Sequence, residues 1–267
     1  MIGPGADATA GAGRAPGGER PWRPKVLAGM TGSGSGFAVD TASGPAVLRE
    51  SDVVWTPCRR VITETYAGTN LYDRITDPAS ADPLAVGAAL REAAALTSAV
   101  ALAAAGRLDL VPPEDRVFGP GTGLIMGAFT WHGPGSRFAD GSRGVYYAAE
   151  TRRTAIRETA YHTAHELAGN PPVVVHKALI EAALRAVLVD VRAPRPTPDG
   201  VYDPTDYRPG QAFGRTVRTL EADGIAYDSV RDPGGACAAV FRPPVLSGAR
   251  VVEVLEYRWD GRALWTP

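Results

Sequence analysis

A strand followed directly by a helix constrains the fold of this chain more than any other feature. Residues 144–149 include a β-branched residue and two adjacent tyrosines, as in a buried strand, and residues 151–167 have helical character. A helix that follows a strand places its N-terminal peptide dipoles near the end of that strand. We therefore expect three side chains to converge on one cleft: Arg137 from the preceding turn, Tyr147 from the strand and Glu158 from the helix.

Composition limits the functional classes open to the chain. Its 267 residues, 45% of them hydrophobic, could form one large domain or two small ones with a real core. The formal net charge of −1 lacks the excess of Lys and Arg that binds phosphate backbones, so direct contact with nucleic acid is not expected. Cys58 and Cys237 are too few for a disulfide framework or a four-thiolate zinc site. This cysteine usage fits a reducing cytoplasm.

Neither a secretion signal nor a membrane span is expected. Residues 1–18 are rich in glycine and interrupted by proline, unlike a charged segment followed by an apolar one. Residues 93–105 form the most apolar run, but spanning a bilayer takes about 20 apolar residues. The alanines of this run instead predict a packed helix over residues 83–107.

The first part of the chain differs in composition from the rest. Residues 1–44 contain eleven of the 31 glycines, together with prolines and serines. Such a segment buries too little apolar area to offset the entropy lost when its backbone is ordered. We therefore expect a disordered tail at residues 1–46 and a folded domain at residues 47–267.

Strands and helices alternate irregularly in the remaining sequence. The patterns predict a short helix at residues 210–222 and strands at 53–65, 124–131, 173–180, 186–191, 225–230, 238–241 and 251–259. A short turn would join the strands at 173–180 and 186–191, although the sequence EAALRA between them could also form helix. This mixture predicts a single α+β domain.

Four segments together resemble the RES-domain family, the toxins of RES-Xre toxin-antitoxin pairs. They are RVITETYAGTNLYDRITDP, LVPPEDRVFGPGTGLIMGAFTW, GSRFADGSRGVYYAAETRRTAIRET and DGIAYDSVRDPGGACAAVFRP. The resemblance covers about residues 47–262. It implies a fold similar to that of ADP-ribosyltransferase toxins, and the degradation of NAD by hydrolysis or phosphorolysis.

The resemblance also assigns roles to individual residues. Arg137 matches a family arginine before the strand, Tyr147 the aromatic residue of the strand, Glu158 the helix glutamate, and Ser229 the serine. Arg116 is a counterpart for an earlier arginine, but its sequence context differs from that of the family. Either Arg116 or Arg137 could therefore bind the pyrophosphate of NAD, and Arg60 is another candidate.

These residue types suit the implied chemistry. Arginine presents a planar fork of donors that binds a diphosphate bidentately. The Tyr147 ring can stack on nicotinamide with its hydroxyl free for a ribose or water. The Glu158 carboxylate can stabilise the oxocarbenium-like charge that develops as nicotinamide leaves. The Ser229 hydroxyl would position ribose, phosphate or the nucleophile, and nothing beside it in the sequence suggests that it is itself the nucleophile.

Each assignment has a structural alternative. Arg137 and Glu158 could be solvated surface residues, and Ser229 could cap a strand end. Tyr146 and Tyr147 alternate faces on a strand, so one of them should pack in the core, and the resemblance favours Tyr147 in the cleft.

Two histidines have the spacing of a possible metal pair. His162 and His165 are three residues apart on a helix, but the HExxH pattern fails and no third ligand is evident. No metal is expected, and the two histidines are interpreted as polar residues on a solvated helix face.

The resemblance implies a cytoplasmic NAD-degrading toxin with an Xre-type antitoxin that covers the cleft and contacts DNA in its place. A homodimer is possible. Two alternatives belong to other classes: an ADP-ribosyltransferase that modifies a cellular protein, and a catalytically silent binding module of the same fold.

Overall fold

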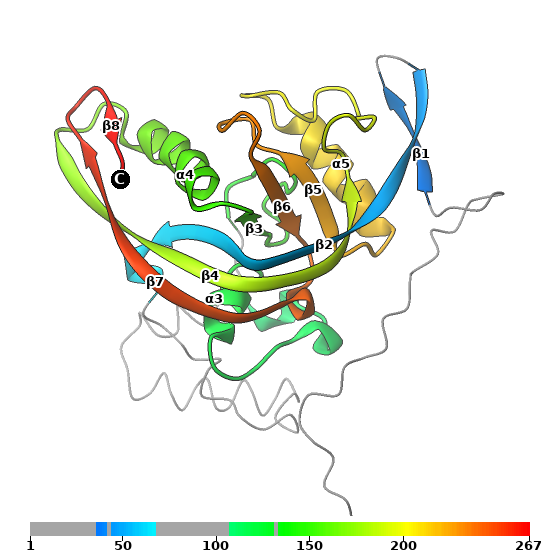
Figure 1. Ribbon diagram of the computed structural model, residues 1–267, viewed down its shortest axis with the longest axis horizontal. Coiled ribbons are helices and arrows are strands. Elements are labelled where there is room, and N and C mark those ends of the chain that lie inside the picture. The colour runs from blue at the N-terminus through cyan, green and yellow to red at the C-terminus, as the bar shows by residue number, and fades with distance from the viewer. Residues whose placement is uncertain (1–35, 42–43, 68–106, 131–132) are drawn as a thin grey trace, which may run out of the picture.

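The computed structural model describes residues 36–41, 44–67, 107–130 and 133–267 (Figure 1). Within these residues eight strands form one mixed sheet in the order β1-β2-β3-β6-β5-β4-β7-β8. The strands are β1 (Gly36–Thr41), β2 (Gly44–Thr63), β3 (Tyr146–Ala149), β4 (Val173–Asp190), β5 (Gly224–Asp228), β6 (Ala236–Val240), β7 (Leu246–Trp259) and β8 (Leu264–Trp265). The helices are α3 (Thr122–Met126), α4 (Arg152–Leu167) and α5 (Arg208–Thr219), with short 3₁₀ turns η1 (Glu64–Tyr66), η4 (Leu108–Leu110), η5 (Pro113–Asp115) and η6 (Pro243–Val245). One mixed sheet with helices packed against it confirms the predicted α+β class.

The sheet closes on itself because β2 also pairs with β4. These two strands run antiparallel over a long register, from Arg49 opposite Asp190 to Thr63 opposite Lys177. On its other edge β2 meets β3 at a single residue pair, Arg59 opposite Ala149. The ring of strands is therefore nearly open between β2 and β3.

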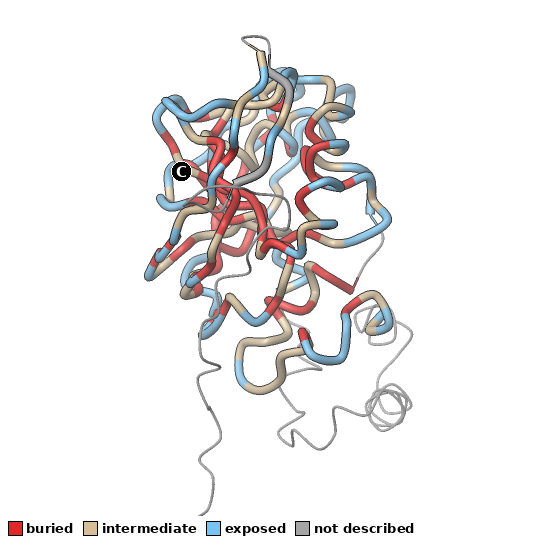
Figure 2. Tube along the Cα trace, turned by 90° about the vertical axis from the view of Figure 1, so that its right-hand side faces the viewer, coloured by how far each residue is buried: buried red, intermediate tan, exposed pale blue. Residues whose placement is uncertain are grey.

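Both faces of β4 are covered from Lys177 onward, which explains why most of its residues from there to Asp190 are buried. Ile180 and Leu188 belong to a core cluster that includes Ile125 of α3, whereas Leu179 packs with Ile156 of α4. Figure 1 shows α4 and α5 within the curve of the long strands and α3 on their outer side. Figure 2 shows the buried residues concentrated along the central strands.

The strand predicted at residues 144–149 and the helix predicted at residues 151–167 form close to those positions. Helix α4 begins after Thr151, whose side chain accepts a hydrogen bond from the Thr154 backbone N–H and so satisfies one free donor of the first turn. The helix ends at Leu167, and the chain then passes through Gly169 at φ +84°. Strand β3 lies inside the predicted 144–149 segment.

Strand β4 corrects the prediction of two strands joined by a turn. Residues 173–190 form one strand, and the EAALRA segment lies within it. Alanine and leucine favour helix locally, but this segment pairs with β2 on one side and with β7 on the other. Tertiary pairing therefore overrides the local preference.

The predicted strand at residues 124–131 is also wrong. Residues Thr122–Met126 form α3, which follows Gly121 at φ +80° and is succeeded by turns. Leu124, Ile125 and Met126 are all buried, and a short apolar run of this kind does not distinguish a strand from a buried helix by its period.

The ordered fold begins before residue 47. Strand β1 at Gly36–Thr41 pairs with the first residues of β2, so part of the segment predicted to be a disordered tail belongs to the sheet. Residues 1–35 and the predicted helix at 83–107, apart from its last residue, lie outside the described residues. No helix in the described part of the chain is long and apolar enough to cross a membrane.

Candidate functional site

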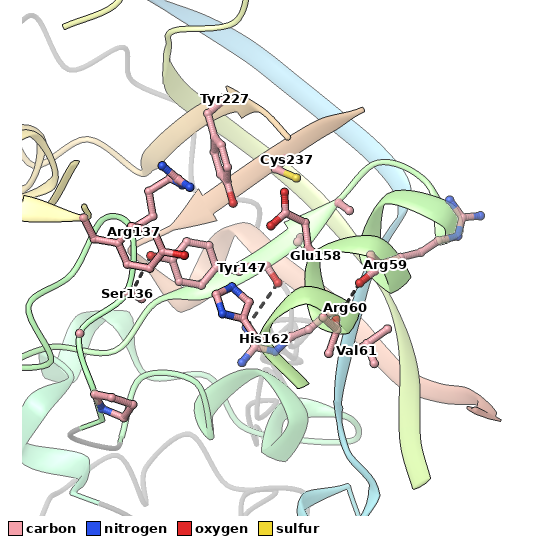
Figure 3. A pocket seen from close by; sticks show the side chains of 17 residues that line it. Arg59, Arg60, Val61, Ser136, Arg137, Tyr147, Glu158, His162, Tyr227 and Cys237 are labelled. Carbon is pink, nitrogen blue, oxygen red and sulfur yellow. Dashed lines mark hydrogen bonds between the residues drawn. The ribbon is translucent and has the colours of Figure 1, made fainter. Parts of the chain in front are cut away.

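A cavity of about 360 Å³ lies beside the narrow junction between β2 and β3. Its walls come from β2, β3, β5, β6, α4, the turn before β3 and the loop before α5. The volume is at the lower end of the range for small-molecule sites. Figure 3 shows its side chains from these elements pointing into one space. The polar and aromatic lining residues are Arg59, Arg60, Ser136, Arg137, Tyr147, Glu158, Thr159, His162, Tyr207, Tyr227 and Cys237.

The structure brings Arg137, Tyr147 and Glu158 together in this cavity, as the sequence order predicted. Each comes from a different element: the turn before β3, β3 itself and the second turn of α4. Ser229 does not line the cavity but contacts Glu158 directly. Its hydroxyl donates to Glu158 Oε1 at 2.5 Å.

The hydroxyl of Ser229 is fully engaged in hydrogen bonds within the protein. A hydroxyl has one donor hydrogen and two acceptor lone pairs. The Ser229 oxygen donates to Glu158 and accepts from the backbone N–H groups of Asp232 at 2.9 Å and Arg231 at 3.2 Å. Ser229 therefore caps the turn after β5 and also fixes the Glu158 carboxylate. The role of its hydroxyl toward ribose, phosphate or a nucleophile stays a prediction.

The turn that holds Ser229 is also attached to the start of α4. Asp232 is buried and accepts hydrogen bonds from Thr154 Oγ1 at 2.8 Å and Arg153 Nη2 at 2.6 Å. Burial raises the pKa of Asp232, but these hydrogen bonds outweigh it and lower the pKa from its ordinary value. The turn and the helix that carries Glu158 are thus joined by charge-assisted bonds.

Tyr146 and Tyr147 divide between core and cavity as strand alternation predicts. Tyr146 is fully buried in the core cluster, and Tyr147 lines the cavity. The Tyr147 hydroxyl is 2.8 Å from Ser136 Oγ and accepts from the Phe138 N–H at 3.0 Å. It is therefore engaged by the protein rather than free for a ligand, so Tyr147 offers the cavity its ring.

Arg137 is buried and held by the loop before α5. Its Nη1 donates to the carbonyl oxygens of Val201 and Asp203, both at 2.8 Å, and its Cζ lies 4.9 Å from the centre of the Tyr207 ring. Among the described residues its Nε and Nη2 have no hydrogen-bond partner. Gly210 allows α5 to approach this segment, because a Cβ there would lie 2.4 Å from the Arg137 carbonyl oxygen.

The structure does not place Arg116 at the cavity. Its Nε donates to the Val111 carbonyl at 3.0 Å and its Nη2 to the Leu108 carbonyl at 3.4 Å, which holds it against the 3₁₀ turns. The structure therefore gives no support to its assignment to the pyrophosphate, whereas the other two candidates, Arg60 and Arg137, both line the cavity. Arg60 donates to the Tyr147 carbonyl at 3.3 Å. Burial lowers the pKa of Arg60, but a guanidinium stays charged at physiological pH.

Seven of the polar and aromatic lining residues were not predicted as site residues, and three of them, His162, Tyr227 and Cys237, lie near Glu158. His162 follows Glu158 by four residues, a spacing that puts two side chains on one face of a helix and could have indicated its place. Tyr227 and Cys237 are buried on neighbouring strands, β5 and β6, next to Glu158 (Figure 3). Burial raises the pKa of both groups, so the Cys237 thiol is neutral at physiological pH.

The described residues include no group of three or more His, Cys, Asp or Glu side chains that could hold a metal ion. The His165 ring stacks on the Tyr161 ring with centroids 6.5 Å apart, and His165 does not line the cavity. The two histidines are therefore not equivalent, because only His162 points into the candidate site.

A comparison with models of protein families shows the family to which the chain belongs. The model of the RES domain matches residues 113–260, which is more than half of the chain. The chain belongs to the RES domain family. The match includes Arg137, Tyr147, Glu158 and Ser229. It begins later than the expected residue 47 and therefore does not include Arg60.

The RES-domain assignment rests on the family match alone. No curated protein matches the chain. Among solved structures, the chain is similar to one in the crystal structure of the M. tuberculosis MbcT-MbcA toxin-antitoxin complex, with 12% sequence identity and a TM-score of 0.34. That similarity covers 45% of this chain and 70% of the other.

Proposed function

We propose that this RES-domain protein cleaves the bond between nicotinamide and ribose in NAD, by hydrolysis or phosphorolysis, as the toxin of a toxin-antitoxin pair. Membership of the RES family supports the proposal. The observation that carries it is a carboxylate, Glu158, fixed by Ser229 in a cavity that also contains an aromatic ring and two arginines.

Glu158 is the proposed catalytic residue. One oxygen, Oε1, is committed to Ser229, and among the described residues Oε2 has no hydrogen-bond partner. The carboxylate therefore has an oxygen available to a sugar hydroxyl or to the positive charge that develops on ribose as nicotinamide leaves. Because its position is fixed before the ligand binds, little reorganisation accompanies the reaction.

Arg137 and Arg60 are the proposed diphosphate ligands. Arg137 has donors left after its two carbonyl contacts, and Arg60 contacts the Tyr147 carbonyl and the Tyr146 ring face rather than an acid. Arg59 is less suitable, because Glu181 lies 3.4 Å from its Nε and offsets its charge. Two cations without acidic partners among the described residues favour an anionic ligand, and the Tyr147 ring can stack on nicotinamide.

The partner that we propose is a cognate antitoxin, of the Xre type found in RES-Xre pairs, which covers the cavity. This proposal rests on the family. In this arrangement the antitoxin contacts DNA, which agrees with the chain's net charge of −1.

Product analysis tests the proposed function. The purified protein is incubated with NAD alone, with added inorganic phosphate, and with a cell lysate, and the products are separated by chromatography. We expect nicotinamide together with ADP-ribose or its phosphorylated form. Label from NAD on a lysate protein would instead indicate an ADP-ribosyltransferase, and intact NAD in every sample would refute cleavage.

A further inference from the structure

His162 lies one helical turn after Glu158 and lines the same cavity. Residues four apart on a helix have their side chains side by side, and Figure 3 shows both rising from α4 into the cavity. His162 is exposed to solvent, unlike the buried Tyr227 and Cys237 deeper in the cavity. It is therefore the one imidazole among the described residues that a ligand and a water molecule could reach together in this site.

The surroundings of His162 favour its neutral imidazole. Partial loss of water contact lowers its pKa from the ordinary 6.5, and the positive charges of Arg231 and Arg137 lower it further. Glu158 and Glu166, on its own helix, oppose this shift without cancelling it. Arg231 is held nearby because its Cζ lies 3.3 Å from the centre of the Tyr161 ring, which itself meets the His162 ring edge-on.

We propose that His162 is the general base of the site and takes the proton from the water that replaces nicotinamide. This inference rests on the proposed function. It assigns two separate tasks to one face of α4: Glu158 stabilises the charge on ribose, and His162 activates the acceptor.

The step balances in atoms and charge. A lone pair of the water oxygen forms the new bond to the ribose carbon, and the electron pair of the broken carbon–nitrogen bond leaves with nicotinamide, which becomes neutral. The water proton passes to an imidazole nitrogen of His162, and solvent later removes it. The overall reaction converts NAD⁺ and water into nicotinamide, ADP-ribose and one proton, so a proton acceptor is needed.

The identity of the acceptor decides how much the base matters. Water must lose a proton as it attacks, whereas inorganic phosphate already carries unprotonated oxygens at neutral pH. Hydrolysis should therefore depend on His162 much more strongly than phosphorolysis does. The same residue would influence the ratio of the two products when both acceptors are present.

The test compares His162→Gln with His165→Gln, a matched change on the same helix outside the cavity. Nicotinamide release is measured across a range of pH, with and without inorganic phosphate, and thermal unfolding checks that each variant folds. We expect His162→Gln to lose about 100-fold in hydrolysis, and less in phosphorolysis. We also expect His165→Gln to behave as the wild type does. In the wild type, hydrolysis should fall as the pH drops through the lowered pKa of His162, because the protonated imidazole accepts no proton.

A second variant provides a chemical test. In His162→Ala the exposed position leaves room for free imidazole, which should restore hydrolysis as its concentration rises. If the wild type and His162→Gln hydrolyse NAD at the same rate, the role of His162 is overturned while the proposed function stands. Equal losses of hydrolysis and phosphorolysis, without rescue by imidazole, would also overturn it. A wild-type protein that leaves NAD intact would instead refute the proposed function itself.

Discussion

The hydrogen bond between Ser229 and Glu158 can be tested by removing the Ser229 hydroxyl. Ser229→Ala deletes the 2.5 Å bond to the carboxylate and leaves the buried N–H of Asp232 without its acceptor. A hydrogen bond to a charged group contributes about 1.5–3 kcal/mol. If that energy serves to position Glu158, kcat for NAD cleavage falls about 10- to 100-fold, since each 1.4 kcal/mol is tenfold.

The same substitution should affect KM and stability differently. KM for NAD should change little, because Ser229 does not line the cavity. The free energy of unfolding should fall by about 1–3 kcal/mol, the cost of a buried donor left unpaired. Steady-state nicotinamide release and thermal unfolding measure the two effects separately.

A double-mutant cycle with Glu158→Gln shows whether Ser229 acts through the carboxylate. Glu158→Gln removes the charge and keeps the volume, and it should lower kcat by about 10²–10³-fold. Adding Ser229→Ala to that variant should cost little further activity, because the group that Ser229 positions has already lost its function. Glu166→Gln, an exposed change on the same helix, is the matched control.

Two results would contradict this reasoning. Fully additive losses in the double variant would mean that Ser229 acts independently of Glu158. A Ser229→Ala variant with normal kcat and a raised KM would mean that the hydroxyl contacts the substrate.

Two further predictions concern the supports of the site. Gly210→Ala places a methyl group 2.4 Å from the Arg137 carbonyl and should raise KM for NAD about tenfold or more in steady-state kinetics, whereas Gly133→Ala, whose methyl meets nothing within 4 Å, should not. Asp232→Asn should lower the thermal midpoint at neutral pH by about 2–4 °C per kcal/mol lost. Because the folded-state pKa of Asp232 is lowered, its contribution is present above the ordinary value of 3.8 and is lost as the pH falls through the folded-state pKa. A midpoint difference that does not shrink in acid would refute this assignment.

Local chemistry explains which elements were predictable from the sequence. The start of α4 depends on Thr151 and Thr154, three residues apart, so the cap is readable along the chain. Strand β4 depends on pairing with β2 and β7, more than sixty residues away on either side, and its Ala-rich centre does not signal these partners. The apolar run at residues 124–131 lacks any period that separates a helix from a strand.

The residues of the candidate site also differ in whether local sequence or distant pairing determines their place. Arg137, Tyr147 and Glu158 lie within one strand-and-helix unit, so their convergence could be expected from the sequence. Choosing between Arg116 and Arg60 requires knowing that β2 lies beside β3, which no local pattern reveals.

Ser229 and His162 show a different limit of sequence reasoning. The serine could be read as a cap or as a site residue, and it is both a cap and the support of Glu158. The spacing of His162 and His165 alone suggests a metal pair. In the fold, His162 lines the cavity, whereas His165 stacks on Tyr161 outside it.

The narrow junction between β2 and β3 links ligand binding to the integrity of the sheet. Where β2 offers no further backbone partners to β3, the side chain of Arg60 donates to the Tyr147 carbonyl, and that of Arg59 donates to the Glu150 carbonyl just beyond β3. These side chains therefore join two edges that the backbone alone leaves apart. A ligand bound to Arg60 would bridge both edges at once, so occupancy and resistance to unfolding would rise together. Under the proposed function, NAD would add a contact at the one place where the sheet is least completely closed.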